Sequence, residues 1–237
     1  MRYLELTLPT PEENLALDEA LLLDAEATGG EVLRIWEWSR PAVVLGSGCK
    51  LAEEVNQDAC RADGVPILRR SSGGGTVLLG PGCLLFSLVL DTERAKELAD
   101  IRRSYVYILE RIARALAPEV VGAEVRGISD LAIDGRKFSG NAQQRKQRHI
   151  LHHGSLLYAF DAANVARYLP PPPREPEYRA RRAHAEFLMN LALSRAMLAE
   201  RLRVEWRAEA GAGAWPQHDV QRLVSEKYSK AEWVARR

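Results

Sequence analysis

The stretch Asp130-Leu131-Ala132-Ile133-Asp134-Gly135-Arg136-Lys137-Phe138-Ser139-Gly140 carries the clearest fold signal in the sequence. Its Asp-Gly pair is the pair that a two-residue type I′ turn favours, because both central positions of that turn need a positive φ. The apolar residues before the pair and the mixed residues after it predict two strands. The stretch therefore predicts a tight antiparallel hairpin that holds Lys137 on a strand just past the turn.

Further strands are predicted on both sides of this hairpin. Residues 32–38 and 42–45 are short runs rich in branched and aromatic side chains, and we expect them to pair across Ser39-Arg40-Pro41. Residues 77–79 and 84–90 predict another hairpin around Gly80-Pro81-Gly82. The remaining predicted strands cover residues 66–70, 150–160 and 204–207.

The helix signals are interspersed with these strands. Thr10-Pro11-Glu12-Glu13 forms a capping box that predicts a helix ending at Gly29-Gly30. Pro170 to Pro173 predicts an extended surface linker, because proline is excluded from helix interiors and central strands. The other predicted helices cover residues 53–62, 93–115, 184–202 and 220–228. This order favours one α/β (α+β-like) domain over residues 1–237, with a mixed, mostly antiparallel sheet flanked by helices.

Composition excludes several classes of protein. The chain has 237 residues, is 46% hydrophobic and carries a net charge of +1, so it can bury a core and has no general attraction for nucleic acids or membranes. Its three cysteines form no disulfide or metal-binding pattern, which favours a reducing cytoplasm. No stretch reaches the roughly 20 apolar residues of a membrane span. Any anion-binding site must therefore be local.

A glycine run after a predicted strand is the first candidate for such a site. In Arg69-Arg70-Ser71-Ser72-Gly73-Gly74-Gly75, consecutive backbone N–H groups can form a concave anion nest, and guanidinium groups bind phosphate. Only one of the two arginines needs to face the ligand, because neighbours on a strand point to opposite faces. The run matches neither a Walker loop nor G-x-G-x-x-G. Glycine triplets also occur in flexible loops, so this motif alone leaves both interpretations open.

Two other segments contain candidate polar residues. Lys137 on its own fits a solvated strand lysine, but Gly140 on the same strand permits a ligand to come close. His152 and His153 are adjacent on a predicted strand, so their side chains point to opposite faces and are not expected to bind one metal ion. We expect one histidine to face a pocket.

Three motifs, in order and spacing, resemble the lipoate–protein ligase A family. They are residues 69–77, residues 130–143 and His152-His153-Gly154-Ser155-Leu156-Leu157, with Asn14 to Ala20, Lys227-Tyr228 and Trp233 as further matches. The resemblance spans nearly the whole chain. It implies the fold of biotin protein ligases and class II aminoacyl-tRNA synthetase cores. It also implies that lipoate and ATP form lipoyl-adenylate with Mg²⁺, after which the acyl group passes to a lysine of a lipoyl domain.

The resemblance implies a role for individual residues as well. Lys137 matches the essential catalytic lysine, which contacts the acyl carbonyl and the α-phosphate, where a fixed cation stabilises developing charge. No residue is assigned to magnesium. The positions implied to bind substrate or ATP are Arg70, Ser72, Gly73, Gly74, Gly75, Thr76, Val77, Cys83, Asp130, Lys137, Gly140, Ala142, His153 and Gly154.

The sequence departs from the family pattern in two places. Leu79 and Cys83 stand where the family has histidine and asparagine, so the acyl site loses hydrogen-bonding groups. The chain is also expected to be without the accessory C-terminal domain of many bacterial ligases, so that either a separate protein supplies that domain or this branch works without one. The acceptor is expected to be a glycine-cleavage H protein, a dehydrogenase E2 subunit or a specialised lipoate-binding protein.

Two other functions stay open at this stage. An octanoyltransferase or lipoyl amidotransferase of the same superfamily would act through a cysteine thioester, but Gly127-Ile128-Ser129-Asp130 contains no cysteine and none follows Cys83. A buried thiol is the commoner interpretation of Cys83. A protein that binds lipoyl-adenylate without turnover is the other alternative, motivated by the altered residues 79–83.

Overall fold

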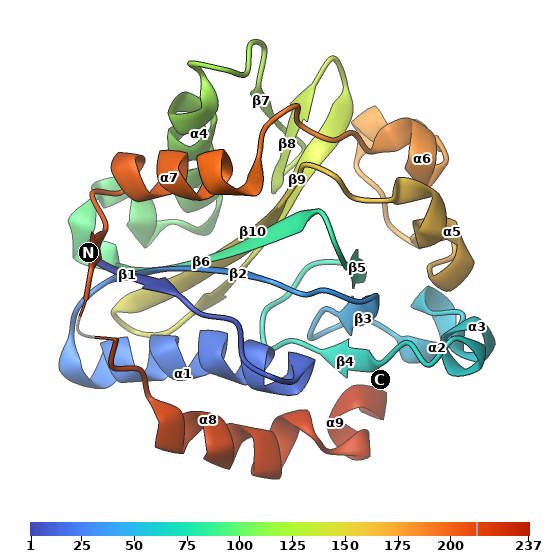
Figure 1. The fold of residues 1–237 in the computed structure, drawn as a ribbon, viewed down its shortest axis with the longest axis horizontal. Helices are drawn as coiled ribbons and strands as arrows, with labels where there is room; N and C mark the ends of the chain where they lie inside the picture. The colour runs from blue at the N-terminus through green and yellow to red at the C-terminus, as the bar shows by residue number, and fades with distance from the viewer. Residues whose placement is uncertain (212) are drawn as a thin grey trace.

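The computed structural model describes residues 1–211 and 213–237, and its centre is a large, mostly antiparallel sheet (Figure 1). In spatial order this sheet consists of β11 (Glu209–Ala210), β1 (Arg2–Glu5), β2 (Val32–Glu37), β6 (Cys83–Asp91), β10 (His149–Leu157), β9 (Arg136–Arg145), β8 (Asp130–Ile133) and β7 (Glu124–Arg126). From β2 to β7 every neighbouring pair is antiparallel, whereas β1 runs parallel to β2 and β11. A smaller sheet holds β4 (Ile67–Arg69), β3 (Ala42–Leu45) and β5 (Val77–Leu79).

Helices cover both faces of the large sheet (Figure 1). The α-helices of the described residues are α1 (Pro11–Thr28), α2 (Leu51–Glu54), α3 (Gln57–Ala62), α4 (Ile101–Leu116), α5 (Val165–Tyr168), α6 (His184–Phe187), α7 (Arg195–Glu205), α8 (Gln217–Leu223) and α9 (Ala231–Ala235). Helices α1 and α8 pack together on one face, and α4 and α7 on the other. Strand β6 serves both layers, because Leu85 and Val89 join the α1 core while Leu84 and Phe86 join the α4 core. The predicted fold class is confirmed.

The strongest local signals form the structures that they predict. The Thr10 side chain accepts the Glu13 N–H and the Glu13 carboxylate accepts the Thr10 N–H, so the capping box begins α1. Such a cap stabilises a helix by about 1 kcal/mol. At the hairpin turn between β8 and β9, Asp134 has φ 49° and Gly135 has φ 70°, as a type I′ turn requires.

Two predicted strand pairings are wrong. Strand β2 lies between β1 and β6, while β3 lies between β4 and β5, so residues 32–38 and 42–45 do not pair. Likewise β5 pairs with β3 and β6 with β2 and β10, so no hairpin surrounds residues 80–82. At both connections the chain crosses from one sheet to the other. A turn signal in the sequence marks the bend but does not tell which sheet the chain joins next.

Several predicted helix limits are also wrong, because polar capping residues restart the helix. Asp100 accepts the Arg103 N–H, so α4 begins at Ile101 and short 3₁₀ turns occupy residues 92–94 and 96–99. Ser194 caps α7 in the same way, which splits the helix predicted over 184–202, and Asn56 splits the one over 53–62. The strand predicted over 204–207 is wrong, since Val204 belongs to α7.

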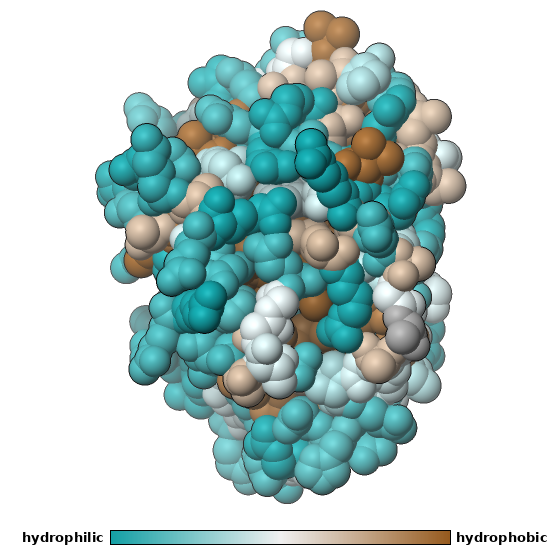
Figure 2. Space-filling view, turned by 90° about the vertical axis from the view of Figure 1, so that its left-hand side faces the viewer, coloured by the Kyte–Doolittle hydropathy of each residue, from teal (hydrophilic) through white to brown (hydrophobic). Residues whose placement is uncertain are grey.

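The outer surface agrees with the composition. Figure 2 views the molecule from the side that is on the left in Figure 1, and hydrophilic residues cover most of this face. Apolar residues appear there as small separate spots, which is normal for a water-exposed surface. Within the described residues, no helix has both the length and the apolar character that crossing a membrane requires.

Candidate active site

A cavity of about 690 Å³ lies where the glycine run meets the large sheet. Its walls come from α1, α6, the strands β2, β3, β5, β6, β8, β9 and β10, the segment after Arg69, the segment before β8 and residues 172–179. Eleven of the positions implied to bind substrate or ATP line it: Arg70, Gly74, Gly75, Thr76, Val77, Asp130, Lys137, Gly140, Ala142, His153 and Gly154. The tertiary structure thus brings all three sequence motifs to one cavity.

Lys137 is held in a defined position at the polar part of the cavity. Its Nζ lies 2.7 Å from Asp130 Oδ1, and the Tyr178 hydroxyl donates to Asp130 Oδ2 at 2.8 Å. The register of β8 against β9 shifts between Leu131 and Ala132, which leaves Phe138 as the extra residue of a β-bulge next to Lys137. Bulges re-aim side chains near functional sites. Lys137 is therefore a positioned cation rather than a freely solvated strand lysine.

Gly140 has a role that the sequence suggested only in part. A Cβ at this position would lie 2.7 Å from Lys137 Nζ and 2.8 Å from Lys137 Cε. The glycine therefore permits a close approach, as predicted, but the group that approaches in this structure is the Lys137 side chain. Gly154 has a similar role, because a Cβ there would lie 2.0 Å from Asn141 Oδ1.

The glycine run wraps around the buried guanidinium of Arg70. This group donates to the carbonyls of Gly73 at 2.6 Å and Gly75 at 2.8 Å, and to Ser72 Oγ at 3.0 Å. Burial lowers the pKa of Arg70 to about 10. In the part of the chain that the structure describes, no protein acceptor receives the N–H groups of residues 73–75. The carbonyls of Gly73 and Gly75 thus point to Arg70, and the backbone N–H groups of the loop can donate hydrogen bonds to an anion.

Arg69 points the other way, as strand alternation predicts. Its guanidinium donates to the carbonyls of Gly46, Cys49 and Val234, all on the side away from the cavity. Gly46 was missed at the sequence level, although it follows a predicted strand as part of Gly46-Ser47-Gly48. A Cβ on Gly46 would lie 1.9 Å from the Gly74 carbonyl oxygen, so the loop packs against bare backbone there.

The two adjacent histidines point to opposite faces, which confirms the prediction. His153 contacts Asp18 Oδ2 through Nδ1 at 3.0 Å and Ser72 Oγ through Nε2 at 2.6 Å. His152 lies 3.1 Å from the Gln143 amide on the α4 side, and burial lowers its pKa to about 3. His153 is therefore the pocket-facing member.

Three residues implied as site residues lie outside the cavity wall. Ser72 and Gly73 belong to the loop but do not line the cavity, and both accept hydrogen bonds from Arg70. Cys83 is 2% exposed at the start of β6, and burial raises the pKa of its thiol to about 12. Cys83 therefore lies away from the cavity wall, whereas Leu79 lines it.

One end of the cavity is apolar. Trp36 and Leu85 are cross-strand partners on β2 and β6, and Ser155 of β10 pairs with Leu85 from the other side. The residues that complete this apolar wall are Leu15, Val44, Val77 and Leu79. Such a surface suits an aliphatic chain, while Lys137 and the glycine run offer charge and amides for a carboxylate or phosphate.

The sequence also missed the segment that covers the cavity. Pro170 to Pro173 were expected to form an extended surface linker to a helix from His184, but Pro172 lines the cavity together with Arg174, Glu175, Arg179 and Phe187. Tyr178, in the same segment, bonds Asp130. Nothing in a proline-rich stretch tells where it docks. Among the described residues, no group of three or more His, Cys, Asp or Glu side chains is arranged to hold a metal ion.

Comparisons with known proteins find both a family and individual relatives of this chain. The family model for the lipoyl protein ligase A/B catalytic domain matches residues 10–203. A probable lipoate-protein ligase A of Mycoplasma pneumoniae is 34% identical over 67% of this chain and 46% of its own length. Octanoyltransferase LipM of Carboxydothermus hydrogenoformans is 33% identical over 66% of this chain and 64% of its own length. The matched part thus spans about half to two thirds of these relatives.

Solved structures show the same fold. A bi-partite lipoate protein ligase from Thermoplasma acidophilum, studied with its E2 lipoyl domain, is similar with a TM-score of 0.82 at 22% identity, covering 99% of this chain and 96% of that one. A lipoate-protein ligase A bound with ATP has a TM-score of 0.81 at 22% identity, covering 99% and 98%. The chain belongs to the lipoyl protein ligase A/B catalytic domain family.

Proposed function

We propose that this protein uses ATP to attach lipoate or octanoate to a specific lysine of a lipoyl-domain protein, through an acyl-adenylate. The observation that carries the proposal is the position of Lys137, fixed by Asp130 at a cavity with one apolar end and a glycine run at its wall. An acyl chain fits the apolar end, and its carboxylate would then lie toward the cation and the loop amides. Residues 1–237 would act as one catalytic unit.

In the first half-reaction the acyl carboxylate oxygen attacks the α-phosphorus of ATP, and pyrophosphate leaves. Lys137 Nζ and the N–H groups of Gly74 and Gly75 would stabilise the negative charge on the phosphoryl oxygens. Asp130 and Tyr178 keep the lysine in place, so little reorganisation is needed as that charge develops. Magnesium would enter with the phosphates, which would supply ligands to it together with water, and no protein ligand is assigned.

In the second half-reaction the neutral amine of the acceptor lysine attacks the acyl carbonyl. The bond from the carbonyl carbon to the phosphate oxygen breaks, AMP leaves and the amine loses its proton. Lys137 would stabilise the oxyanion of the tetrahedral intermediate. The acceptor would be a glycine-cleavage H protein, a dehydrogenase E2 subunit or a specialised lipoate-binding protein.

The rival function is octanoyl transfer through a cysteine thioester. It is favoured by the relatives named octanoyltransferase LipM, one of which, from Moorella thermoacetica, is 26% identical over 100% of this chain. Against it, Cys49, Cys60 and Cys83 are each at most 6% exposed, and none belongs to the cavity wall. Burial raises the pKa of each thiol, which disfavours the thiolate nucleophile.

The deciding experiment is the intact mass of a lipoyl-domain acceptor after incubation with lipoate, ATP and Mg²⁺. We expect the lipoyl mass shift with the wild type, and a rate at least 100-fold lower with Lys137→Ala. A variant with Cys49, Cys60 and Cys83 all changed to alanine should still release pyrophosphate if it folds. Octanoyl transfer from an acyl-carrier protein without ATP would instead support the thioester route, and lipoate binding with no product from any donor would support the non-catalytic alternative.

A further inference from the structure

We propose that Asp18, a buried residue of α1 at the cavity wall, is a positioning residue for the glycine run. It acts through a chain of hydrogen bonds that passes through His153, Ser72 and Arg70. The proposal rests on the proposed function for its catalytic readout. The hydrogen-bond chain itself consists of this protein's own side chains, so its order can be measured without an activity assay. It joins the first helix to a loop more than fifty residues later in the sequence.

The contacts along this chain are short and directional. Asp18 Oδ2 lies 3.0 Å from His153 Nδ1, so that nitrogen carries the proton and Nε2 is the acceptor. Ser72 donates its hydroxyl to Nε2 at 2.6 Å, and its Oγ accepts the Nε–H of Arg70 at 3.0 Å. Arg70 Nη2 then donates to the carbonyls of Gly73 and Gly75. One choice of tautomer satisfies every donor and acceptor along the chain.

Asp18 is firmly held at its own end. The Asp18 Oδ1 atom lies 2.7 Å from Arg34 Nη1, and Arg34 also donates to the carbonyls of Leu6 and Asn14. Both side chains are almost entirely buried. Burial alone would raise the pKa of the Asp18 carboxyl, but the charge of Arg34 and the hydrogen bond from His153 hold it below its ordinary value. The hydrogen-bond chain therefore begins at a carboxylate that is held in one position.

The same atoms resemble a Ser-His-Asp triad, and the geometry argues against that role. Ser72 is 1% exposed and lies outside the cavity wall. Its Oγ also accepts a hydrogen bond from a cation, which makes it a poorer nucleophile. Ser72 therefore transmits the position of His153 to Arg70 instead of attacking an acyl group.

The first test is Asp18→Asn in the full-length protein, with Asp24→Asn as the matched control. Asp24 lies on the same helix, roughly 9 Å further along its axis, and its carboxylate takes no part in the hydrogen bonds that run from Asp18 to Arg70. Because Asp18→Asn leaves Arg34 without its partner and could unfold the protein, His153→Leu is the second variant, since it breaks the chain and keeps the Asp18–Arg34 pair.

The first readout needs no activity. The Ser47 N–H donates to the Ser72 carbonyl at 2.8 Å, so amide hydrogen exchange at Ser47 reports on the loop. We expect exchange at Ser47 to be at least tenfold faster in Asp18→Asn and His153→Leu than in Asp24→Asn. Equal rates in the folded variants and the control would overturn the proposal.

The second readout is kcat/KM for pyrophosphate release with lipoate, ATP and Mg²⁺. Asp18→Asn should lower it about 10- to 100-fold, because a displacement of about 1 Å at a catalytic loop has effects of that size. In a Ser72→Ala background, Asp18→Asn should lower kcat/KM by less than about twofold, because the hydrogen-bond chain is already broken. Additive losses, or an acyl ester found on Ser72, would refute the positioning role. If the wild type releases no pyrophosphate while Ser47 exchange responds as expected, the proposed function fails and the positioning role stands.

Discussion

At the scale of single residues, the site depends on positions where a side chain is absent. Gly140 leaves room for Lys137, and Gly46 lets the Gly74 carbonyl come against the backbone. The sequence marks Gly140 as unusual because it sits within a strand, but the identity of its neighbour depends on how the bulge turns Lys137. The sequence thus indicated that a glycine was needed at position 140, but it did not indicate that the Lys137 side chain is the group that comes close to it.

Gly140→Ala is expected to impair catalysis while leaving the fold intact. The new Cβ would collide only with the far end of the flexible Lys137 side chain, so that side chain must move away from Asp130. We expect kcat/KM for pyrophosphate release to fall at least tenfold, with the free energy of unfolding changed by less than about 1 kcal/mol. Gly48→Ala is the control, because no atom lies within 4 Å of a Cβ there. Wild-type activity in Gly140→Ala would contradict this explanation.

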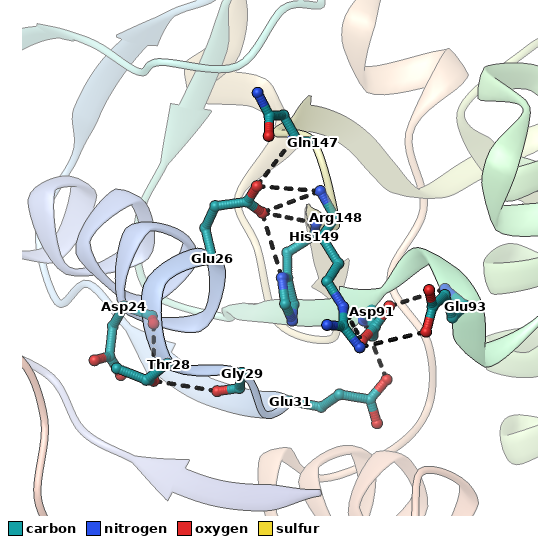
Figure 3. Close-up of polar contacts among 10 residues, drawn as sticks. All are labelled: Asp24, Glu26, Thr28, Gly29, Glu31, Asp91, Glu93, Gln147, Arg148 and His149. Atoms are coloured by element: carbon teal, nitrogen blue, oxygen red, sulfur yellow. Dashed lines mark hydrogen bonds and ion pairs between the residues drawn. The ribbon is translucent and has the colours of Figure 1, made fainter.

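At the scale of elements, α1 anchors the turn between β9 and β10 (Figure 3). The Glu26 carboxylate, near the end of α1, accepts the backbone N–H groups of Gln147, Arg148 and His149 at 2.9–3.2 Å. Arg148 in turn bonds Asp91 at the end of β6. One carboxylate thus joins a helix to a hairpin whose other end carries His153 and Ala142.

This anchor predicts a pH-dependent stability. Burial alone would raise the pKa of the Glu26 carboxyl, but the N–H groups of Arg148 and His149 lower it below its ordinary 4.5. A lowered pKa in the folded state stabilises the protein above the ordinary value, and this contribution is lost as the pH falls through the lowered value. Glu26→Gln should therefore reduce the free energy of unfolding by about 1–3 kcal/mol at pH 7.

Urea unfolding of wild type and Glu26→Gln between pH 7 and pH 3 measures this effect. The difference between the two proteins should shrink steadily below about pH 4.5, where the wild-type carboxyl begins to take up its proton. A difference that stays constant down to pH 3 would show that the carboxylate charge is not the cause.

At the scale of the whole molecule, the last helix supports the strand that leads into the glycine run. Trp233 donates its indole N–H to the Arg69 carbonyl at 2.8 Å, and the Arg69 guanidinium donates to the Val234 carbonyl at 2.6 and 3.0 Å. Arg69 is fully buried. Residues more than 160 positions apart thus fix the backbone next to Arg70.

Removal of residues 231–237 is expected to destabilise the protein and its site together. The lost bonds to a buried guanidinium correspond to roughly 3 kcal/mol, or about 6–12 °C in Tm for a chain of this size. Thermal unfolding and pyrophosphate release would both be measured. The control is Glu232→Ala, an exposed change in the same helix, which should leave Tm within about 2 °C of wild type. An unchanged Tm after truncation would show that the last helix does not stabilise this strand.

The sequence by itself determined the local structures whose causes are local. The capping box of α1, the Asp134-Gly135 turn and the alternation of Arg69 with Arg70 each depend on residues close together in the chain. The composition and order of elements also gave the correct fold class, and three spaced motifs gave the family.

Only the tertiary structure decided which strands pair and what surrounds Lys137. The bends near Pro41 and Gly82 look like hairpin turns, yet both cross between sheets, because distant strands offer the better buried partners. Tyr178 reaches Asp130 from a proline-rich segment, and Asp18 reaches Arg70 through His153 and Ser72. Such contacts depend on long-range packing, which no local pattern of residue types encodes.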